Sequence, residues 1–418
     1  DRDPQLVESA ETCRQIQKCH QLYNLAEPLA RRRPSKAQEY YQRLIASGLT
    51  EAPDFDRAFA EANGARFALS VANCTAANHV SCAACGAGPG DEVVVSPVTD
   101  YGTIYGIVAQ RAIPVFADTD RLTGNITADT IAAVISDRTR ALSVVHWAGI
   151  TCDMAPIVAL AERRGLPIIE DVCQAPLAEY AGRKAGTLGA MGCFSFDGEK
   201  HLSCGSGGAI ITSDEELYQR AANFAGTRGS YVDDPDYGRR HKVLGCNYRF
   251  DNVRMPLAMA QLEALPELVA RRRELGARLS RLLAEIDGVT PSPVPERGDA
   301  VYWIYPFLVE VEAMRVGLPD LARAMAAEGL RGIGSGRYYL VPDSHDLLND
   351  LRRTYGAGAL PGGASDTYFG RGYSAADTPN AKWYVDHMLR FPFTEKYSER
   401  DVEDIARIVG KVVAHYRA

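Results

Sequence analysis

The sequence predicts an α/β fold in which a mostly parallel central sheet carries helices on both faces and is followed by a smaller α+β domain. From residue 66 onward, short apolar runs rich in β-branched residues alternate with helical stretches. Such alternation is typical of βαβ units around a buried parallel sheet. After Asp287-Gly288 the alternation ends and a glycine-rich segment follows at 340–380. We therefore expect an N-terminal helical arm over 1–50, a large domain over 51–265 and a small domain over 266–418.

Each expected element has its own signal. An irregular apolar face predicts helix over 4–45. Apolar, β-branched runs predict the strands, and the helices between them show the helical spacing of apolar residues. Thr127-x-x-Thr130 stands at the start of one helix, where a hydroxyl caps the first turn. Strands are expected at 67–72, 92–97, 113–117, 141–145, 167–170, 192–196, 208–212 and 301–309, and helices after the first two of these and at 127–135, 155–164, 214–223, 254–285, 318–328 and 399–416.

Composition narrows the class of protein. The 418 residues carry a net charge of −7, with 46% hydrophobic and 24% charged residues, which is ordinary for a globular protein. The negative net charge gives no indication of nucleic-acid binding, because that binding needs clustered basic residues. No apolar run approaches the roughly 20 residues of a membrane span. We expect neither nucleic acid nor a membrane as a partner.

The ten cysteines indicate reduced thiols. Several lie in apolar runs, as Cys193 does, which predicts a cytoplasmic protein. Cys82-x-x-Cys85 lies in a helical stretch, and no second Cys/His pair stands at zinc-finger spacing. We therefore expect no metal site.

Two residues near strand ends carry the chemistry. Asp171 ends the strand at 167–170, and Lys200 follows the strand at 192–196 among apolar residues and glycines. Parallel sheets bind ligands beyond the carboxyl ends of their strands. Taken singly, Asp171 fits a helix cap or surface acid equally well, and Lys200 fits an exposed loop. Taken together, they fit a pyridoxal phosphate site, with a carboxylate on the pyridine nitrogen and a lysine for the Schiff base.

Other residues supply what the cofactor's phosphate and ring need. Ser195 offers a hydroxyl, and the stretch Asn73-Cys-Thr-Ala-Ala77 offers backbone N–H groups at a helix N-terminus. Tyr101, just after the second strand, offers an aromatic face. Each signal is weak alone, because Thr75 also fits a helix cap and Tyr101 a core position.

Seven motifs together indicate a known family. They are Ile169-Glu-Asp-Val-Cys-Gln-Ala175, Tyr180-Ala-Gly-Arg-Lys-Ala-Gly-Thr-Leu-Gly189, Ser195-Phe-Asp-Gly-Glu-Lys-His-Leu202, Gly88-Pro-Gly-Asp-Glu-Val-Val-Val95, Val115-Phe-Ala-Asp118, Asn247-Tyr-Arg249 and Pro379-Asn-Ala381. Through them the chain resembles the DegT/DnrJ/EryC1/StrS family, the fold-type I, pyridoxal phosphate-dependent sugar and aminocyclitol aminotransferases. The resemblance is strongest over about 55–265.

The resemblance implies a role for each matching residue. Lys200 takes the Schiff-base position, Asp171 the ring-nitrogen position, and Gln174 the position that bonds the ring hydroxyl. In the same way Ser195, Thr75 and Ala76 take phosphate-binding positions, Tyr101 stacks on the ring, and Asn247 reaches the phosphate of a neighbouring subunit. The last role implies a homodimer with shared active sites.

The family's activity implies a ping-pong transfer. Glutamate or glutamine gives its amino group to the cofactor, with Lys200 as base and acid, and a keto group on a sugar, nucleotide-sugar or aminocyclitol receives it. Two stretches look closest to family members that act in antibiotic and other secondary metabolism. They are Lys200-His-Leu-Ser-Cys-Gly205 and Arg239-Arg-His-Lys-Val-Leu-Gly245. Candidate substrate contacts are Arg228, Arg240 and His201, although surface charge explains the arginines equally well.

Three departures from the family pattern bear on the reaction. The family often has Gln-Ala-His-Gly where this chain has Gln174-Ala-Pro-Leu177, and Gly-Glu-Gly-Gly where it has Gly205-Ser-Gly-Gly208. The first 50 residues lack the usual family opening. Two alternatives stay open: a related sugar dehydratase or epimerase, and a regulatory protein that binds the cofactor without catalysis. Dehydrases of this type carry His at the Schiff-base position, whereas this chain has Lys200 with His201 beside it.

Overall fold

The computed structural model describes residues 36, 38–40, 42–43, 54–226, 231–236, 238–241, 243–344, 348 and 372–418. The expected N-terminal arm over 1–50 lies almost wholly outside these residues, as do Arg228 and Lys242. Within the described part of the chain, no helix combines the length and apolarity of a membrane span.

The elements of the large domain follow the predicted order closely. They are α4 (Phe55–Asn63), β1 (Phe67–Val71), α5 (Cys74–Ala84), β2 (Glu92–Val95), α6 (Tyr101–Ala109), β3 (Ile113–Phe116), α7 (Ala128–Ala132), β4 (Thr139–Val145), η1 (Trp147–Gly149), α8 (Met154–Arg164), β5 (Ile168–Asp171), β6 (Glu179–Tyr180), β7 (Arg183–Lys184), β8 (Met191–Ser195), β9 (Gly208–Thr212), α9 (Glu215–Gly226), β10 (Tyr231–Asp234) and β11 (Gly238–His241).

The remaining elements build the second, smaller unit. They are α10 (Met255–Ala284), β12 (Val289–Pro291), β13 (Ile304–Val309), η2 (Val311–Ala313), α11 (Leu318–Ala327), α12 (Val341–Ser344), η3 (Ala375–Asp377), α15 (Pro379–His387), β14 (Met388–Pro392) and α16 (Glu399–Tyr416).

Seven strands form the central sheet, in the order β1-β9-β8-β5-β4-β2-β3. The strands from β8 to β3 are parallel to their neighbours, and β9 alone runs antiparallel to both β8 and β1. The predicted fold class, a mostly parallel sheet with helices on both faces, is confirmed. The parallel strands therefore present their carboxyl ends along one edge, where ligands bind in such sheets.

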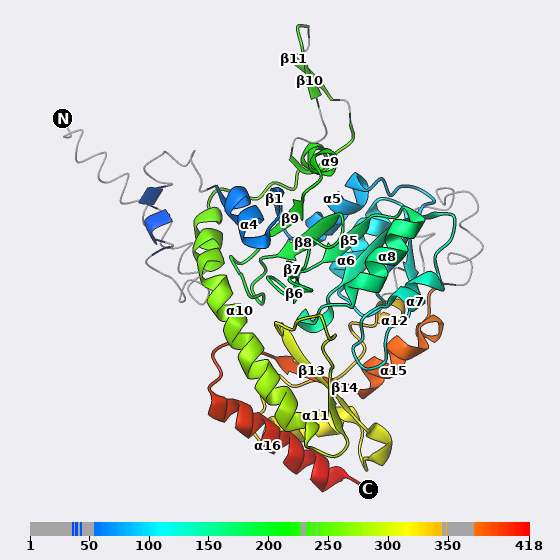
Figure 1. Ribbon diagram of the computed structural model, residues 1–418, viewed down its shortest axis with the longest axis vertical. Coiled ribbons are helices and arrows are strands. Elements are labelled where there is room, and N and C mark those ends of the chain that lie inside the picture. Colours follow the sequence, from blue (N-terminus) through cyan, green and yellow to red (C-terminus); the bar gives the residue numbers. More distant parts are fainter. Residues whose placement is uncertain are drawn as a thin grey trace, which may run out of the picture.

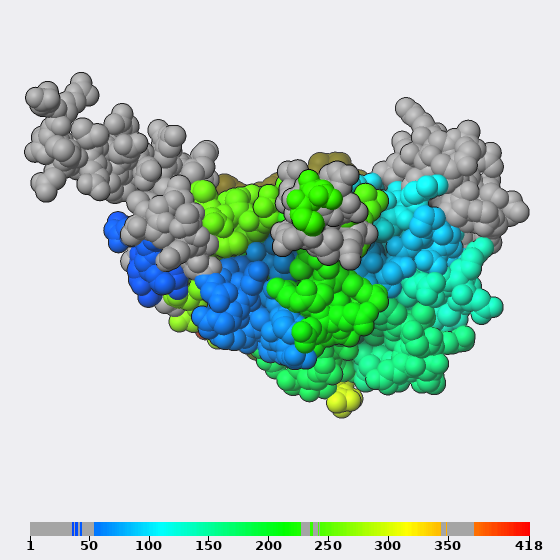
Figure 2. Space-filling model, turned by 90° about the horizontal axis from the view of Figure 1, so that it is seen from above, coloured from blue at the N-terminus to red at the C-terminus, as the bar shows by residue number. Residues whose placement is uncertain are grey.

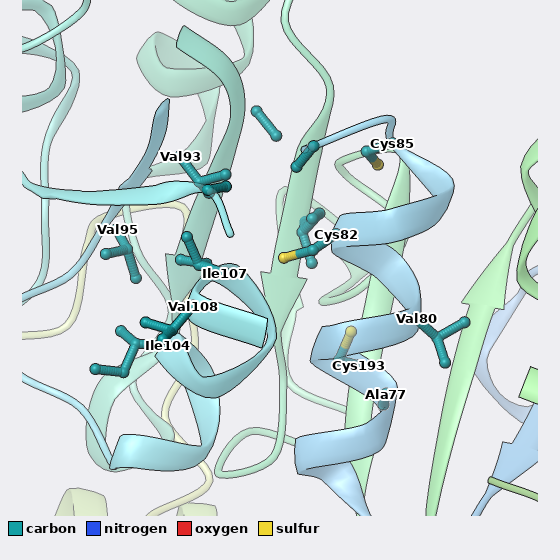
Figure 3. Close-up of a cluster of buried hydrophobic side chains, with 14 of the residues drawn as sticks. Ala77, Val80, Cys82, Cys85, Val93, Val95, Ile104, Ile107, Val108 and Cys193 are labelled. Carbon is teal, nitrogen blue, oxygen red and sulfur yellow. The ribbon is translucent and has the colours of Figure 1, made fainter. Parts of the chain in front are cut away.

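Alternate residues of the sheet enter different cores. Cys193 and Ile210 pack with α5 and α6, whereas their neighbours Phe194 and Ile211 pack with α4 and α10. Figure 3 shows the first of these cores between α5, α6 and the sheet, with Cys82 among aliphatic side chains. This burial of both faces explains why the strands read as continuous apolar runs.

The smaller unit packs α11, α16 and the second half of α10 around the antiparallel sheet β12-β13-β14. Figure 1 shows the long α10 passing from the large domain down to this unit, where the C-terminal α16 lies beside it. The expected domain boundary at 265 thus falls inside α10, and the boundaries remain a proposal.

One hairpin stands away from the body. Within the described part of the chain, the strands β10 and β11 pair only with each other, and they project beyond α9 (Figure 1). Seen from above, their green atoms stand over the middle of that face (Figure 2). Behind the hairpin the chain returns to the body, where the Ala72 N–H donates to the Tyr248 carbonyl at 2.7 Å.

Two sequence motifs far apart in the chain meet at the start of α15. The Asp118 carboxylate accepts the N–H groups of Asn380 and Ala381 at 3.0 and 2.9 Å. A carboxylate at a helix N-terminus satisfies amides that have no partner within the helix. Asp118 therefore fixes the small unit against the carboxyl end of β3.

Candidate active site

A cavity of about 400 Å³ lies at the carboxyl ends of the parallel strands. Its walls come from the turns after β1, β2, β5 and β8 and from two segments of the small unit. The lining residues are Asn73, Cys74, Thr75, Asn78, Asp100, Gly102, Thr103, Asp171, Cys173, Ser195, Asp197, Glu199, Lys200, Trp303, Tyr338 and Tyr339. The fold thus brings together four residues that the sequence analysis singled out: Thr75, Asp171, Ser195 and Lys200.

Asp171 is buried at the end of β5, and three donors hold its carboxylate. Oδ2 accepts from Asn78 Nδ2 at 3.0 Å and from Thr103 Oγ1 at 2.8 Å, and Oδ1 accepts the Cys173 N–H at 3.1 Å. A carboxylate has roughly four acceptor positions. The fourth position, which the Cys173 thiol also reaches, is the one that a protonated pyridine nitrogen needs.

Asn78 and Thr103 escaped the sequence analysis. Asn78 lies one turn after Cys74 on α5, and Thr103 lies in the first turn of α6. Residues three or four positions apart on a helix lie on the same face. The spacing of Asn78 from Cys74 and of Thr103 from the start of α6 could therefore have placed both side chains near the ligand edge.

Lys200 is half-buried, and its amine faces an aromatic ring from the small unit. Lys200 Nζ lies 3.5 Å from the centroid of the Trp303 ring, the geometry of a cation–π contact. The Trp303 indole is itself fixed, because its Nε1 donates to the Glu199 carbonyl at 3.0 Å. No sequence signal joined these residues, since about a hundred positions separate them.

The turn after β1 is shaped as a helix N-terminus. Asn73 caps α5, with its Oδ1 accepting the Ala76 N–H at 2.8 Å. The Ala76 amide, expected at the phosphate, is thus bonded to Asn73, and the Thr75 and Ser195 hydroxyls line the cavity beside it. A Cβ at Gly208 would lie 2.6 Å from the Asn73 carbonyl carbon. The glycine that begins β9 therefore lets this turn pack closely.

Ser206, a departure from the family pattern, supports the same turn. Its hydroxyl donates to the Ala72 carbonyl at 3.2 Å, and its own carbonyl accepts from Arg254.

The other departure, Pro176-Leu177, includes a strained backbone conformation. Leu177 has φ +57° at a position where the family often has glycine. A left-handed conformation costs a non-glycine residue roughly 1–2 kcal/mol. Its buried side chain offsets that cost.

Two predicted cofactor contacts lie beside the cavity lining that the described residues form. Gln174 is buried, and its Oε1 accepts the Ala148 N–H at 2.6 Å. Tyr101 begins α6, and its neighbours Asp100 and Gly102 line the cavity. Their roles toward the cofactor remain predictions.

The other predicted contacts are not among the lining residues that the structure describes. His201 is buried, and its Nε2 lies 2.9 Å from the Val301 carbonyl oxygen. Arg240 belongs to the projecting β11. Asn247 is exposed, and its Oδ1 accepts from Arg249 Nε at 3.0 Å. Of the adjacent pair Lys200 and His201, the structure thus presents the lysine to the cavity.

Two thiols also meet in the cavity. Cys74 and Cys173 share a hydrogen bond, which together with burial raises the pKa of Cys74 well above its usual value. For Cys173 that hydrogen bond lowers the pKa, but burial and Asp171 outweigh it and the net shift is upward. The sequence analysis gave neither thiol a role, although Cys74 lies in the stretch that it placed at the phosphate.

Comparison with known proteins assigns the chain to a family. The model of the DegT/DnrJ/EryC1/StrS aminotransferase family matches residues 35–410. The chain belongs to this family. Its lysine, its buried aspartate and the helix N-terminus with two hydroxyls fit pyridoxal 5'-phosphate, the cofactor of the family.

Individual relatives agree with that assignment. GDP-perosamine synthase of Caulobacter vibrioides is 34% identical over 302 residues, covering 72% of this chain and 80% of the relative. The spore coat polysaccharide biosynthesis protein SpsC of Bacillus subtilis is 30% identical over 394 residues, covering 90% and 94%. An aminotransferase structure from Psychrobacter cryohalolentis superposes with a TM-score of 0.77 at 27% identity, covering 91% and 97%. The chain is therefore a pyridoxal phosphate-dependent aminotransferase of the sugar aminotransferase family.

Proposed function

We propose that the enzyme moves the amino group of glutamate or glutamine to a keto group of a sugar, nucleotide-sugar or aminocyclitol in a secondary-metabolic pathway. One observation carries the proposal: Lys200 and Asp171 line one cavity from the ends of neighbouring strands β8 and β5. GDP-perosamine synthase among the relatives supports a sugar acceptor.

The chain's own residues supply orientation and proton transfer. Bound pyridoxal phosphate provides an electron sink next to the carbon that loses its proton. Asp171, held by its hydrogen-bond donors, would keep a proton on the ring nitrogen. The Thr75 and Ser195 hydroxyls and the first amides of α5 would hold the phosphate. Lys200 Nζ would accept the proton from the donor's α-carbon and act in turn as the general acid.

The small unit completes the enclosure. Trp303, Tyr338 and Tyr339 cover the cavity, and the Tyr338 hydroxyl donates to Asp100 Oδ2 at 3.0 Å. The Trp303 ring against Lys200 Nζ limits the access of water to the amine, which protects the proton that the lysine carries.

A second copy of the chain supplies Asn247 in this proposal. Asn247 follows the projecting hairpin and is exposed in the single chain. Leu244, three residues earlier, is 89% exposed, which is unusual for a large apolar side chain on a free surface segment. A homodimer that buries this segment brings Asn247 to the partner's phosphate.

The enzyme acts in the cytoplasm in this proposal. None of the described cysteines forms a disulfide, which supports a reducing compartment.

Transfer of label tests the function. The purified enzyme is incubated with ¹⁵N-glutamate or amide- and amine-labelled glutamine and a panel of keto-sugars, nucleotide-keto-sugars and keto-cyclitols. We expect the label of the donor's α-amine in one class of product and none with Lys200→Ala. Release of water from the acceptor without nitrogen transfer would support the dehydratase alternative instead.

A further inference from the structure

The cavity holds two thiols beside Asp171 that cofactor binding does not explain. The Sγ atoms of Cys74 and Cys173 and a carboxylate oxygen of Asp171 all lie within 4.8 Å of one another. Cys74 and Asp171 are buried and Cys173 is half-buried. Two soft sulfurs and one carboxylate are the donor set that Zn²⁺ and Cd²⁺ prefer.

We propose that the cofactor-free enzyme binds one thiophilic divalent cation, such as Zn²⁺ or Cd²⁺, through Cys74, Cys173 and Asp171, and that this cation and pyridoxal phosphate exclude each other. An ion about 2.3 Å from each sulfur spans ligand atoms at such separations. Three protein ligands leave the fourth tetrahedral position open toward the cavity. Each thiol releases its proton when the metal–sulfur bond forms.

The exclusion follows from Asp171. Asn78, Thr103 and the Cys173 N–H fill three acceptor positions, and the fourth is the one that the Cys173 thiol reaches until it loses its proton to metal binding. Either a metal ion or the pyridine nitrogen occupies that position, but not both. This part of the inference rests on the proposed role of Asp171 in holding the cofactor.

The Cys82-x-x-Cys85 motif is the natural competitor for the metal. In the structure, however, both thiols lie in the apolar core between α5 and the sheet (Figure 3). Among the described residues, Cys74, Asp171 and Cys173 are the only group of three metal-ligating side chains whose ligand atoms lie this close together. Cys82→Ala is therefore the matched control for cavity cysteines.

The test titrates cofactor-free, full-length protein with CdCl₂ and follows the ultraviolet charge-transfer band of the cadmium–thiolate bond. We expect one equivalent of Cd²⁺. Cys74→Ser and, separately, Cys173→Ser should weaken binding by more than about 10-fold, the cost of losing even an outer-shell partner. Cys82→Ala should keep the wild-type titration. No band, or a band unchanged in either serine variant that folds, would contradict the site.

The exclusion has its own readout. The cadmium-loaded protein, incubated with pyridoxal phosphate and then desalted, should carry no cofactor band, whereas protein treated first with a chelator should carry one. A cofactor band that forms while the cadmium–thiolate band persists would overturn the exclusion. Failure of the metal-free protein to bind the cofactor would count against the proposed function and leave the metal site standing.

Discussion

The Lys200 amine lies over the face of Trp303, 3.5 Å from the ring centroid, although Lys200 follows β8 of the central sheet and Trp303 precedes β13 of the smaller antiparallel sheet. The contact stabilises the protonated amine that forms when Lys200 takes a proton. We expect Trp303→Leu to slow the half-reaction with the amino donor by about 2- to 30-fold, the range of a cation–π contact. Stopped-flow absorbance of the cofactor measures this rate.

Two comparisons separate this role from simple packing. Trp303→Phe keeps a ring face and should recover part of the rate, whereas cofactor affinity should change little in either variant. Trp383 lies on α15, its ring centroid is 4.3 Å from the Arg121 guanidinium, and it is not one of the residues that line the cavity. Trp383→Leu removes this cation–π contact and should leave the rate unchanged. Equal slowing in both leucine variants would show a general packing defect.

Thr103 tests how Asp171 is held. Thr103→Val removes the 2.8 Å hydrogen bond to Asp171 at nearly constant volume. A hydrogen bond to a charged group contributes about 1.5–3 kcal/mol. The dissociation constant of pyridoxal phosphate should therefore rise about 10- to 100-fold in an absorbance titration. Thr119→Val is the matched control, because the buried Thr119 hydroxyl has no hydrogen-bond partner among the described residues. Unchanged affinity in Thr103→Val would contradict the account of Asp171.

Asp56 predicts a pH dependence of stability. Burial raises the pKa of Asp56 to about 6, against the lowering effect of its hydrogen bond with Ser70. Because the folded state binds the proton more tightly, this group's contribution is fully present below about pH 4 and is lost as pH rises through 6. Asp56→Asn should therefore be more stable than wild type near pH 8, by up to about 3 kcal/mol, and similar near pH 4.

Thermal unfolding at the two pH values measures the Asp56 effect. Asp54→Asn, which keeps a capping side chain at the start of α4, controls for the loss of a nearby surface charge. A stability difference between Asp56→Asn and wild type that does not change with pH would refute the prediction.

The β6–β7 hairpin offers a stabilising substitution. Its two turn residues, Ala181 and Gly182, have φ of +52° and +76°, as a type I′ turn requires. Alanine is strained there, whereas asparagine tolerates this conformation. Ala181→Asn should stabilise the exposed turn by roughly 0.5–1 kcal/mol. A lower unfolding temperature than wild type would contradict the turn assignment.

The sequence predicted the large domain well because its strands are buried on both faces. Such strands read as apolar runs, as Ile168–Asp171 does, and their ends locate the ligand edge. The reversed direction of β9 was not predictable from its composition. The strand β14 was missed because Met388–Pro392 is short and gains its identity from pairing with β13.

The site was predictable only where chemistry and strand ends coincide. Asp171 and Lys200 combine a titratable group with such a position, and both line the cavity. Trp303 and Tyr339 line the cavity because the smaller unit packs against the central sheet. The local sequence around these two residues does not show that packing. Asn247 lies outside the cavity of a single chain, and its predicted role depends on a second copy.

Chemical trapping on Lys200 tests the central claim most directly. The enzyme with bound pyridoxal phosphate is reduced with borohydride, digested and mapped by mass spectrometry, before and after incubation with the amino donor. We predict a reduced cofactor adduct on Lys200 before donor addition and its disappearance afterward, as the lysine is released. An adduct on another lysine, or none on Lys200, would contradict the account.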